Sequence, residues 1–222
     1  MIPQGLLERR TGTVARSFFL IRPAASHKNE GSPLAAGSLR GGEWNTVSVY
    51  ENIRRILERL NLPYEEIDHG AVSGCEDSQD FRRLAGWSGA SSKCILFHAK
   101  GRYYLVVTTA QKEIIARRFK KEFGTKDIRF AKLEELARWT GCEPGSVSPF
   151  GHPSEELPYY IDEDIFKAEY FMFNPAVPTR SMRIRSSDLR KMYAALPNPV
   201  RYFSEDEEGR FSVRADEKIR PA

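Results

Sequence analysis

The sequence has few cysteines and no long apolar run, and each shortage excludes a class of protein. Its 222 residues include three cysteines, Cys75, Cys94 and Cys142, and none of them forms a C-x-x-C pair. This usage argues against a disulfide framework and against a zinc site, and it favours a reducing compartment, so we expect a cytoplasmic protein. No apolar run approaches the roughly 18 residues that a membrane-spanning helix needs. We therefore expect no membrane domain.

Patterns typical of metal binding or of nucleophilic catalysis are also missing. The four histidines, His27, His69, His98 and His152, are not spaced as metal ligands, so we expect no metal and no other cofactor. No Ser-His-Asp or Cys-His set can be recognised. The formal net charge of +4 is compatible with a nucleic-acid partner but does not require one.

Composition divides the chain into three regions. Residues 1–47 show no sustained periodicity, and we expect either a disordered leader or an extension added by an upstream start codon; a transit peptide is a further alternative. Residues 204–222 are highly charged, which predicts a flexible tail. Residues 48–203 are regular and are expected to fold as a single domain.

Apolar periodicity and turn residues predict both helices and strands between residues 48 and 203. A capping box of Ser48 and Glu51 begins a helix that ends before Pro63, and a turn at 99–102 between two apolar runs predicts a hairpin. The other expected helices cover about 75–85, 111–123, 133–139 and 187–196, and the strands cover 64–68, 94–97, 103–107, 128–130, 159–161, 168–173 and 181–185. This mixture predicts an α/β or α+β fold with a mixed sheet.

Residues 141–151 combine three glycines and two prolines with almost no charge. Such a segment cannot be a helix or a central strand, because glycine reaches backbone angles closed to other residues and proline fixes φ and removes a donor. We expect a stiff loop whose bare N–H groups a ligand can approach; a plain structural connection is the alternative. Lys93 stands upstream, near the start of an apolar strand, where an edge-strand lysine that discourages aggregation is the alternative explanation.

Several motifs follow one another in a characteristic order. They include Lys93, Gly-Arg-Tyr-Tyr-Leu-Val-Val at 101–107, Gly-Ser-Val-Ser-Pro-Phe-Gly at 145–151, Tyr-Ile-Asp-Glu at 160–163 and Phe-Met-Phe-Asn at 171–174. In this order they resemble the prolyl-tRNA synthetase editing-domain family, which includes the freestanding aminoacyl-tRNA deacylases of the YbaK/ProX type. The resemblance covers roughly residues 50–196, and the motif at 145–151 is its most specific part.

The resemblance implies a single α/β domain at 48–203, built around a mixed and largely antiparallel sheet flanked by helices. It implies hydrolysis of the ester of a mischarged aminoacyl-tRNA, which clears a wrong, small amino acid from, most often, proline tRNA. Because the sequence contains no synthetase domain, it resembles the members that act in trans. Aminoacyl-tRNA is then the expected substrate, and prolyl-tRNA synthetase is a further expected partner.

The resemblance also implies a site and a mechanism. N–H groups of the loop would stabilise the tetrahedral oxyanion, each contributing about 3 kcal/mol, and the terminal ribose hydroxyl of the substrate would help to activate water. The implied catalytic residues are Lys93, Gly145, Ser148 and Asp162. The implied substrate-binding residues are Gly141, Cys142, Pro144, Ser146, Val147, Pro149, Phe150, Gly151 and Asn174.

Structural alternatives exist for two of these residues and for the expected tRNA contacts. Asp162 has the position of a helix N-cap, and Asn174, which precedes a proline, is also a common turn former. The expected helix at 111–123 carries the residues assigned to contacts with tRNA phosphates: Lys112, Arg117, Arg118, Lys120 and Lys121. An ordinary solvated face, balanced by Glu113 and Glu122, is the alternative for that helix.

Two positions depart from the pattern of the relatives that clear alanine. Cys94 follows Lys93 where an asparagine is usual, and Asn174 stands where a histidine is usual. Neighbouring side chains alternate along a strand, so we expect Cys94 to pack in the core, opposite to Lys93. The fold and the hydrolase class survive these changes, but the identity of the amino acid does not follow. The competing functions are a non-catalytic tRNA- or synthetase-binding module and a domain that binds small molecules.

Overall fold

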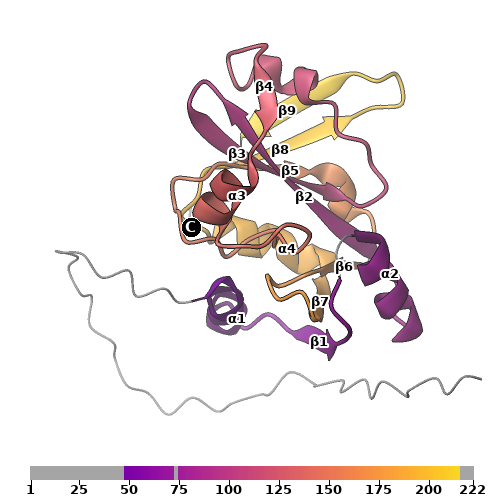
Figure 1. Cartoon of the computed structure of the whole chain (residues 1–222). Coiled ribbons are helices and arrows are strands. Elements are labelled where there is room, and N and C mark those ends of the chain that lie inside the picture. The colour runs from indigo at the N-terminus through magenta and orange to yellow at the C-terminus, as the bar shows by residue number, and fades with distance from the viewer. Residues whose placement is uncertain (1–47, 73–74, 216–222) are drawn as a thin grey trace, which may run out of the picture.

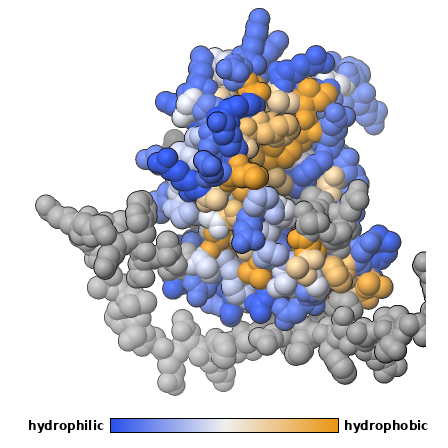
Figure 2. Space-filling model, viewed as in Figure 1, coloured by the Kyte–Doolittle hydropathy of each residue, from blue (hydrophilic) through white to orange (hydrophobic). Residues whose placement is uncertain are grey.

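A computed structural model describes residues 48–72 and 75–215 of the chain. The expectations for residues 1–47 and for residues 216–222 lie outside this part. Within it, no helix is both long and apolar enough to cross a membrane. Figure 2 shows one face of the molecule, which is largely hydrophilic, with hydrophobic groups gathered mainly in its upper half.

Nine strands in the described part form one mixed sheet, with β1 and β9 at its two ends (Figure 1). The order is β1-β7-β6-β2-β3-β5-β8-β9, and β4 pairs with β2 beside this path. Only β2–β6, β3–β5 and β5–β8 among these pairings are parallel. The predicted fold class, with a mixed and largely antiparallel sheet, is therefore confirmed. The strands are β1 (Tyr64–Asp68), β2 (Ala90–Ala99), β3 (Arg102–Thr109), β4 (Ile128–Phe130), β5 (Tyr159–Asp162), β6 (Tyr170–Phe173), β7 (Arg180–Arg185), β8 (Val200–Glu205) and β9 (Phe211–Ala215).

Across residues 48–72 and 75–215, four α-helices flank the sheet: α1 (Val49–Arg59), α2 (Cys75–Leu84), α3 (Leu133–Thr140) and α4 (Ser186–Ala194). Helix α1 begins as the capping box predicts, since Ser48 Oγ accepts from the Glu51 N–H at 3.2 Å and Glu51 Oε2 accepts from the Ser48 N–H at 3.1 Å. Its residues Val49, Ile53 and Leu57 recur every four positions and are buried in the core. Burial of each such side chain contributes roughly 1.5–3 kcal/mol.

The sheet carries two main apolar clusters. The larger cluster joins α1 and α4 to the sheet and includes Phe150, from the glycine- and proline-rich loop. The smaller cluster is mainly aromatic and contains Phe97, Tyr104, Phe119, Phe123, Tyr160 and Phe203. Its rings meet edge to face or stacked, as at Phe119 and Phe203, whose centroids lie 5.2 Å apart. This cluster holds the connection between β3 and β4 against the sheet.

The predicted hairpin is formed by β2 and β3. Ala99 pairs with Arg102, and the two residues of the turn, Lys100 and Gly101, have φ angles of 51° and 73°. Positive φ at both central residues is typical of the turn whose twist matches that of the strands. The resulting register places Lys93 of β2 opposite Thr108 of β3.

The predicted helix at 111–123 is wrong. Within this segment only η1 (Ala116–Lys120) is helical, and it is a 3₁₀-helix. Tertiary contacts override the local pattern, because Lys112 is drawn to two carboxylates while Phe119 and Phe123 enter the aromatic cluster.

The predicted tail at 204–222 is wrong for the residues that the structure describes. Residues 204–205 complete β8, and β9 pairs with it in an antiparallel register. Among the charged residues of this segment, Phe211 and Val213 are two positions apart, so they share one face of β9 and pack against the aromatic cluster. Ser204 and Ser212 share a hydrogen bond of 3.1 Å across the two strands.

Candidate active site

A cavity of about 90 Å³ lies between β2, α2, the glycine- and proline-rich loop and the end of β6. It is lined by Ser78, Arg82, Ser92, Lys93, Cys94, Gly145, Val147 and Asn174. The fold thus brings Lys93 to the middle of the loop and to Asn174, although the three segments are far apart in the sequence. A larger depression of about 330 Å³ lies beside α1 and His152, but its lining includes none of the four predicted catalytic residues.

Lys93 is partly buried and held in place by the backbone. Its Nζ donates a short hydrogen bond to the carbonyl oxygen of Lys112. β2 pairs with β3 at Lys93, but on its other side β6 pairs only with Ala90 and Ser91, and β4 only with Phe97, His98 and Ala99. A lysine that protects a sheet edge extends into solvent, whereas Lys93 lines the cavity and its ammonium is bonded to a backbone carbonyl.

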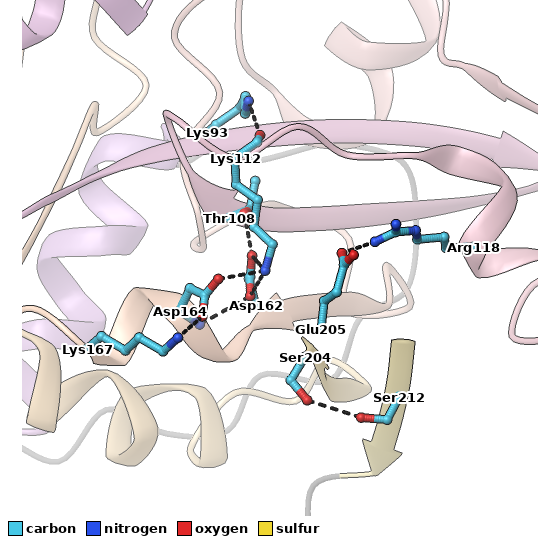
Figure 3. A network of polar contacts seen from close by, with 10 residues as sticks. All are labelled: Lys93, Thr108, Lys112, Arg118, Asp162, Asp164, Lys167, Ser204, Glu205 and Ser212. Carbon is cyan, nitrogen blue, oxygen red and sulfur yellow. Dashed lines mark hydrogen bonds and ion pairs between the residues drawn. The ribbon is translucent and has the colours of Figure 1, made fainter. Parts of the chain in front are cut away.

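The side chain of Lys112 is anchored on two carboxylates (Figure 3). Its Nζ lies 2.9 Å from Asp162 and 2.6 Å from Asp164, and only 18% of the side chain is exposed. Burial by itself would lower the pKa of the Lys112 ammonium, but hydrogen bonds to Asp164 and Asp162 outweigh it and raise that pKa. The same pairing, with that to Lys167, outweighs burial and lowers the pKa of the Asp164 carboxyl. Because the carbonyl of Lys112 accepts from Lys93, this network also fixes the position of the Lys93 ammonium.

Asp162 is fully buried and does not line the cavity. Its Oδ2 accepts from Thr108 Oγ1 at 2.5 Å, and its Oδ1 accepts from the Asp164 N–H at 3.1 Å. The second contact makes Asp162 the N-cap of the 3₁₀-helix η2 (Glu163–Phe166), in agreement with the structural alternative for this residue. A direct contact of Asp162 with a substrate amine is not supported by this placement. Asp162 is linked to Lys93 only indirectly, because Asp162 binds the Lys112 ammonium and the Lys112 carbonyl binds the Lys93 ammonium.

The loop at 141–151 contains neither helix nor strand, as predicted. Only its middle reaches the cavity, through Gly145 and Val147. Gly145 is exposed and has a φ of 84°, a left-handed conformation that favours glycine. Pro144 is exposed beside it and does not line the cavity.

The two ends of the loop pack against the body of the domain. Gly141 is the C-cap of α3, with a φ of 66°, and its N–H donates to the Ala137 carbonyl at 2.9 Å. A Cβ on Gly151 would lie 2.7 Å from Ile53 Cγ1 of α1. Cys142 and Phe150 are buried in the main core. None of these four residues lines the cavity, so their placement is structural.

The hydroxyl groups of the loop serve the loop itself. Ser148 is fully buried, and its Oγ donates to the Phe150 carbonyl at 2.8 Å. Ser146 Oγ donates to the Glu143 carbonyl at 3.1 Å, and the Pro149 carbonyl accepts from the Tyr193 hydroxyl at 3.3 Å. The lining of the cavity includes neither serine, so the structure does not bring Ser148 to the position expected of a catalytic residue.

Arg82 is a cavity residue that sequence reasoning missed. It is 2% exposed, and its Nε donates to Ser181 Oγ at 2.9 Å. His69 Nε2 lies 3.0 Å from the same hydroxyl, and its Nδ1 lies 2.7 Å from the Gly70 carbonyl oxygen. Because that carbonyl can only accept, Nδ1 carries the proton and Nε2 accepts from Ser181. The available signal was the four-residue spacing of Ser78 and Arg82 on one helix face.

Cys94 and Cys142 differ in their access to the cavity. Cys94 packs against the main core, as expected, and it also borders the cavity beside Lys93. Cys142 is buried, and burial raises the pKa of its thiol. A raised pKa leaves a cysteine in the unreactive thiol form. The described residues contain no group of three or more His, Cys, Asp or Glu side chains that could hold a metal ion.

A second feature, the basic groove, lies on the surface between η1 and β9 and has a volume of about 330 Å³. Its lining comprises Arg117, Arg118, Lys120, Lys121, Glu122, Phe211 and Val213. Arg118 is paired with Glu205 of β8. Lys112, which we grouped with these residues, does not line the groove, because its side chain turns to Asp162 and Asp164.

The sequence matches the family described as aminoacyl-tRNA editing domain over residues 70–192. The proline--tRNA ligase of Bacillus licheniformis is 29% identical over 117 residues, which are 48% of this chain and 20% of the ligase. That of Staphylococcus aureus strain Newman is 29% identical over 100 residues, 45% of this chain and 17% of the ligase. The chain therefore spans about a fifth of the length of the curated relatives that it matches.

Two solved structures resemble the fold. A candidate trans-editing enzyme for prolyl tRNA synthetase has a TM-score of 0.55 at 20% identity, over 70% of this chain and 96% of the other. The hypothetical protein APE2540 has a TM-score of 0.57 at 17% identity, over 68% and 97%. At these identities the likeness concerns the fold.

Proposed function

The chain belongs to the aminoacyl-tRNA editing domain family, and on that premise we propose that it hydrolyses the ester of a mischarged aminoacyl-tRNA. One observation carries the proposal: Lys93, Gly145 and Asn174 line the same small cavity. All three residues fall within the part of the chain that matches the family. The cavity therefore belongs to the region that defines membership.

In the proposed reaction, the ester carbonyl lies between Lys93 and the middle of the loop. The Ser146 N–H is already bonded to the Glu143 carbonyl, so the amides of Gly145 and Val147 are the candidate oxyanion donors. Each such donor contributes about 3 kcal/mol to transition-state stabilisation. The Lys93 ammonium adds positive charge beside the developing oxyanion or the terminal phosphate. Asp162 acts as a positioning residue, through Lys112.

Water activation is assigned to the substrate. A general base must lie within hydrogen-bond distance of the proton that it removes. The described side chains that line the cavity include neither a histidine nor a carboxylate. The terminal ribose hydroxyl of the tRNA would supply the missing group, and Ser148, bonded within the loop, would support the loop's shape.

The size of the cavity favours a small amino acid. A volume of about 90 Å³ accommodates a few non-hydrogen atoms in addition to the ester, since a water molecule in the liquid takes up about 30 Å³. Proline tRNA is the proposed carrier because the curated relatives cited above are proline--tRNA ligases. Action in trans, with prolyl-tRNA synthetase as partner, follows the same likeness and that to the candidate trans-editing enzyme.

The basic groove is the proposed contact for tRNA phosphates. Arg117, Lys120 and Lys121 are exposed there, and phosphates attract such groups without any reading of sequence. Lys112 is not part of this proposed contact, because the charge of its ammonium is balanced by Asp162 and Asp164.

A non-catalytic tRNA-binding module is the second candidate. It is favoured by the same absence of a titratable base from the described lining, and by Asn174 in place of the usual histidine. Its prediction is opposite to that of the deacylase, because binding would occur without turnover.

Deacylation of a panel of mischarged tRNAs separates the two candidates. We expect the wild type to hydrolyse at least one ester of a small amino acid, and Lys93→Ala to lose most of that activity. Lys126→Ala, which removes an exposed lysine away from the cavity, is the matched control and should behave as the wild type. Binding of tRNA without hydrolysis of any ester would favour the module instead.

A further inference from the structure

Asn174 carries a buried hydrogen-bond acceptor that the protein leaves unused. The residue lines the cavity and is 5% exposed. Its Nδ2 donates to the Arg180 carbonyl at 3.1 Å, while its Oδ1 has no hydrogen-bond partner among the described residues. A carbonyl only accepts, so the Arg180 contact fixes which end of the amide is nitrogen. A buried acceptor without a hydrogen bond destabilises the folded protein.

The carbonyl that accepts from Asn174 belongs to Arg180, whose side chain is held by several contacts. Arg180 is paired with Glu66 at 3.0 Å and with Asp68 at 2.8 Å, and its guanidinium carbon lies 5.1 Å from the centre of the Tyr50 ring. These contacts hold the backbone carbonyl to which Asn174 is bonded. The amide oxygen is therefore presented in a fixed place, as a binding site for a ligand requires.

The described lining of the cavity contains side chains that only donate hydrogen bonds and one side chain with an unused acceptor. Lys93 and Arg82 bring side chains that can only donate, and Gly145 and Val147 of the loop line the cavity beside them. Asn174 brings the unused acceptor. The aminoacylated end of a tRNA has the complementary asymmetry, because the ester carbonyl and the tRNA phosphate oxygens accept whereas the α-amino group donates.

We propose that Asn174 Oδ1 accepts a hydrogen bond from the α-amino group of the aminoacyl ester and so selects substrates with a free amine. The inference rests on the proposed function. A ribose hydroxyl is also a donor, but the ribose is joined to the tRNA and stays near the opening, whereas Asn174 is almost fully buried. A cavity of about 90 Å³ does not admit the ribose together with the aminoacyl group.

The test measures binding without turnover, by calorimetry on the full chain. The probes are 3′-alanylamino-3′-deoxyadenosine, its propionylamino analogue without the amine, and the 2′-deoxy form of the alanylamino compound. We expect the wild type to bind the amine-bearing probe about tenfold more tightly than the propionylamino probe, as one hydrogen bond allows. Asn174→Leu, which keeps the size but removes the acceptor, should reduce that preference to about twofold or less. Asn174→Asp loses the bond to the Arg180 carbonyl but presents a charged acceptor to the cationic amine, and it should retain the preference.

Three results would overturn the inference: equal binding of the first two probes by the wild type, an amine preference that survives Asn174→Leu, or a loss in that variant confined to the 2′-hydroxyl. Thermal unfolding of both variants checks that they fold, and Asn174→Ala replaces Asn174→Leu if the latter does not. Hydrolysis of mischarged tRNA is measured in parallel. An amine preference without hydrolysis contradicts the proposed function alone, and hydrolysis without the preference contradicts this inference alone.

Discussion

The cavity and the basic groove use the same kinds of side chain in opposite surroundings. In the cavity, Lys93 is partly buried and its ammonium is held by a backbone carbonyl. In the groove, Arg117, Lys120 and Lys121 are exposed. A held cation acts on one atom of a ligand, whereas exposed cations act through a field that salt screens over about 8–10 Å. The comparison indicates that burial and anchoring, rather than residue type, distinguish a cation proposed to act in catalysis from cations proposed to bind tRNA phosphates.

Replacement of Lys93 should have the largest effect. Lys93→Ala is expected to lower kcat for the best ester by about 100- to 1000-fold, because a preorganised charge beside the oxyanion is lost. Affinity for uncharged tRNA should stay close to that of the wild type, since the groove is intact. Single-turnover kinetics and a tRNA binding assay measure the two quantities. An equal loss in both would erase the distinction between cavity and groove.

The loop that forms one wall of the cavity should not tolerate a side chain at Gly151, where its C-terminal end packs against α1. Gly151→Ala is expected to lower the free energy of unfolding by roughly 2–4 kcal/mol, because φ is 89° and the new Cβ would lie 2.7 Å from Ile53. Gly86→Ala is the matched control: φ there is 73° and nothing lies within 4 Å, so only the backbone cost remains. Urea unfolding compares the two variants. A loss no greater for Gly151→Ala would mean that the loop end is not fixed by packing.

His152, which follows Gly151, should make the free energy of unfolding sensitive to acid. His152 is buried against Tyr159, with Nδ1 2.8 Å from the phenol oxygen, and burial lowers its pKa from 6.5 to about 3. Below about pH 6.5 the unfolded chain takes up a proton that the folded chain refuses. The free energy of unfolding should then fall by about 1.4 kcal/mol per pH unit until about pH 3.

Unfolding measured from pH 7.5 to pH 4 in the wild type and in His152→Gln checks this slope. Below about pH 6.5 the slope of the variant should be smaller than that of the wild type by about 1.4 kcal/mol per pH unit, which corresponds to one proton. Above pH 7 the two slopes should be equal. Identical slopes over the whole range would show that His152 does not stay neutral in the folded state.

Removal of the groove cations should have the smallest effect on the reaction and the largest on its salt dependence. Arg117→Ala/Lys120→Ala/Lys121→Ala is expected to weaken tRNA binding about tenfold and to reduce the slope of log K against log salt by roughly 2–3. The kcat of the best ester should not change. Binding titrations at several salt concentrations, with Lys126→Ala as the control, measure the slope. An unchanged slope would remove the groove from the proposed tRNA interface.

Much of the local structure could be predicted because it is encoded in neighbouring residues. The capping box at Ser48, the turn at Lys100 and Gly101, and the irregular loop at 141–151 depend on contacts within a few positions. The segment at 111–123 failed because its pattern was helical while its contacts were distant, with Lys112 bonded to Asp162 and Asp164. β9 was missed because its apolar residues are few and gain their partners only beside β8.

By itself, the sequence determined the fold class, the order of most elements and the motifs by which the family is recognised. Only the tertiary structure decided which residues of those motifs meet. It brought Gly145 and Val147 to the cavity, kept Ser148 and Asp162 in structural contacts, and added Arg82 from α2. The reason is physical: a motif fixes residue types along the chain, whereas access to a cavity depends on side-chain directions that are set by pairing and packing between distant segments.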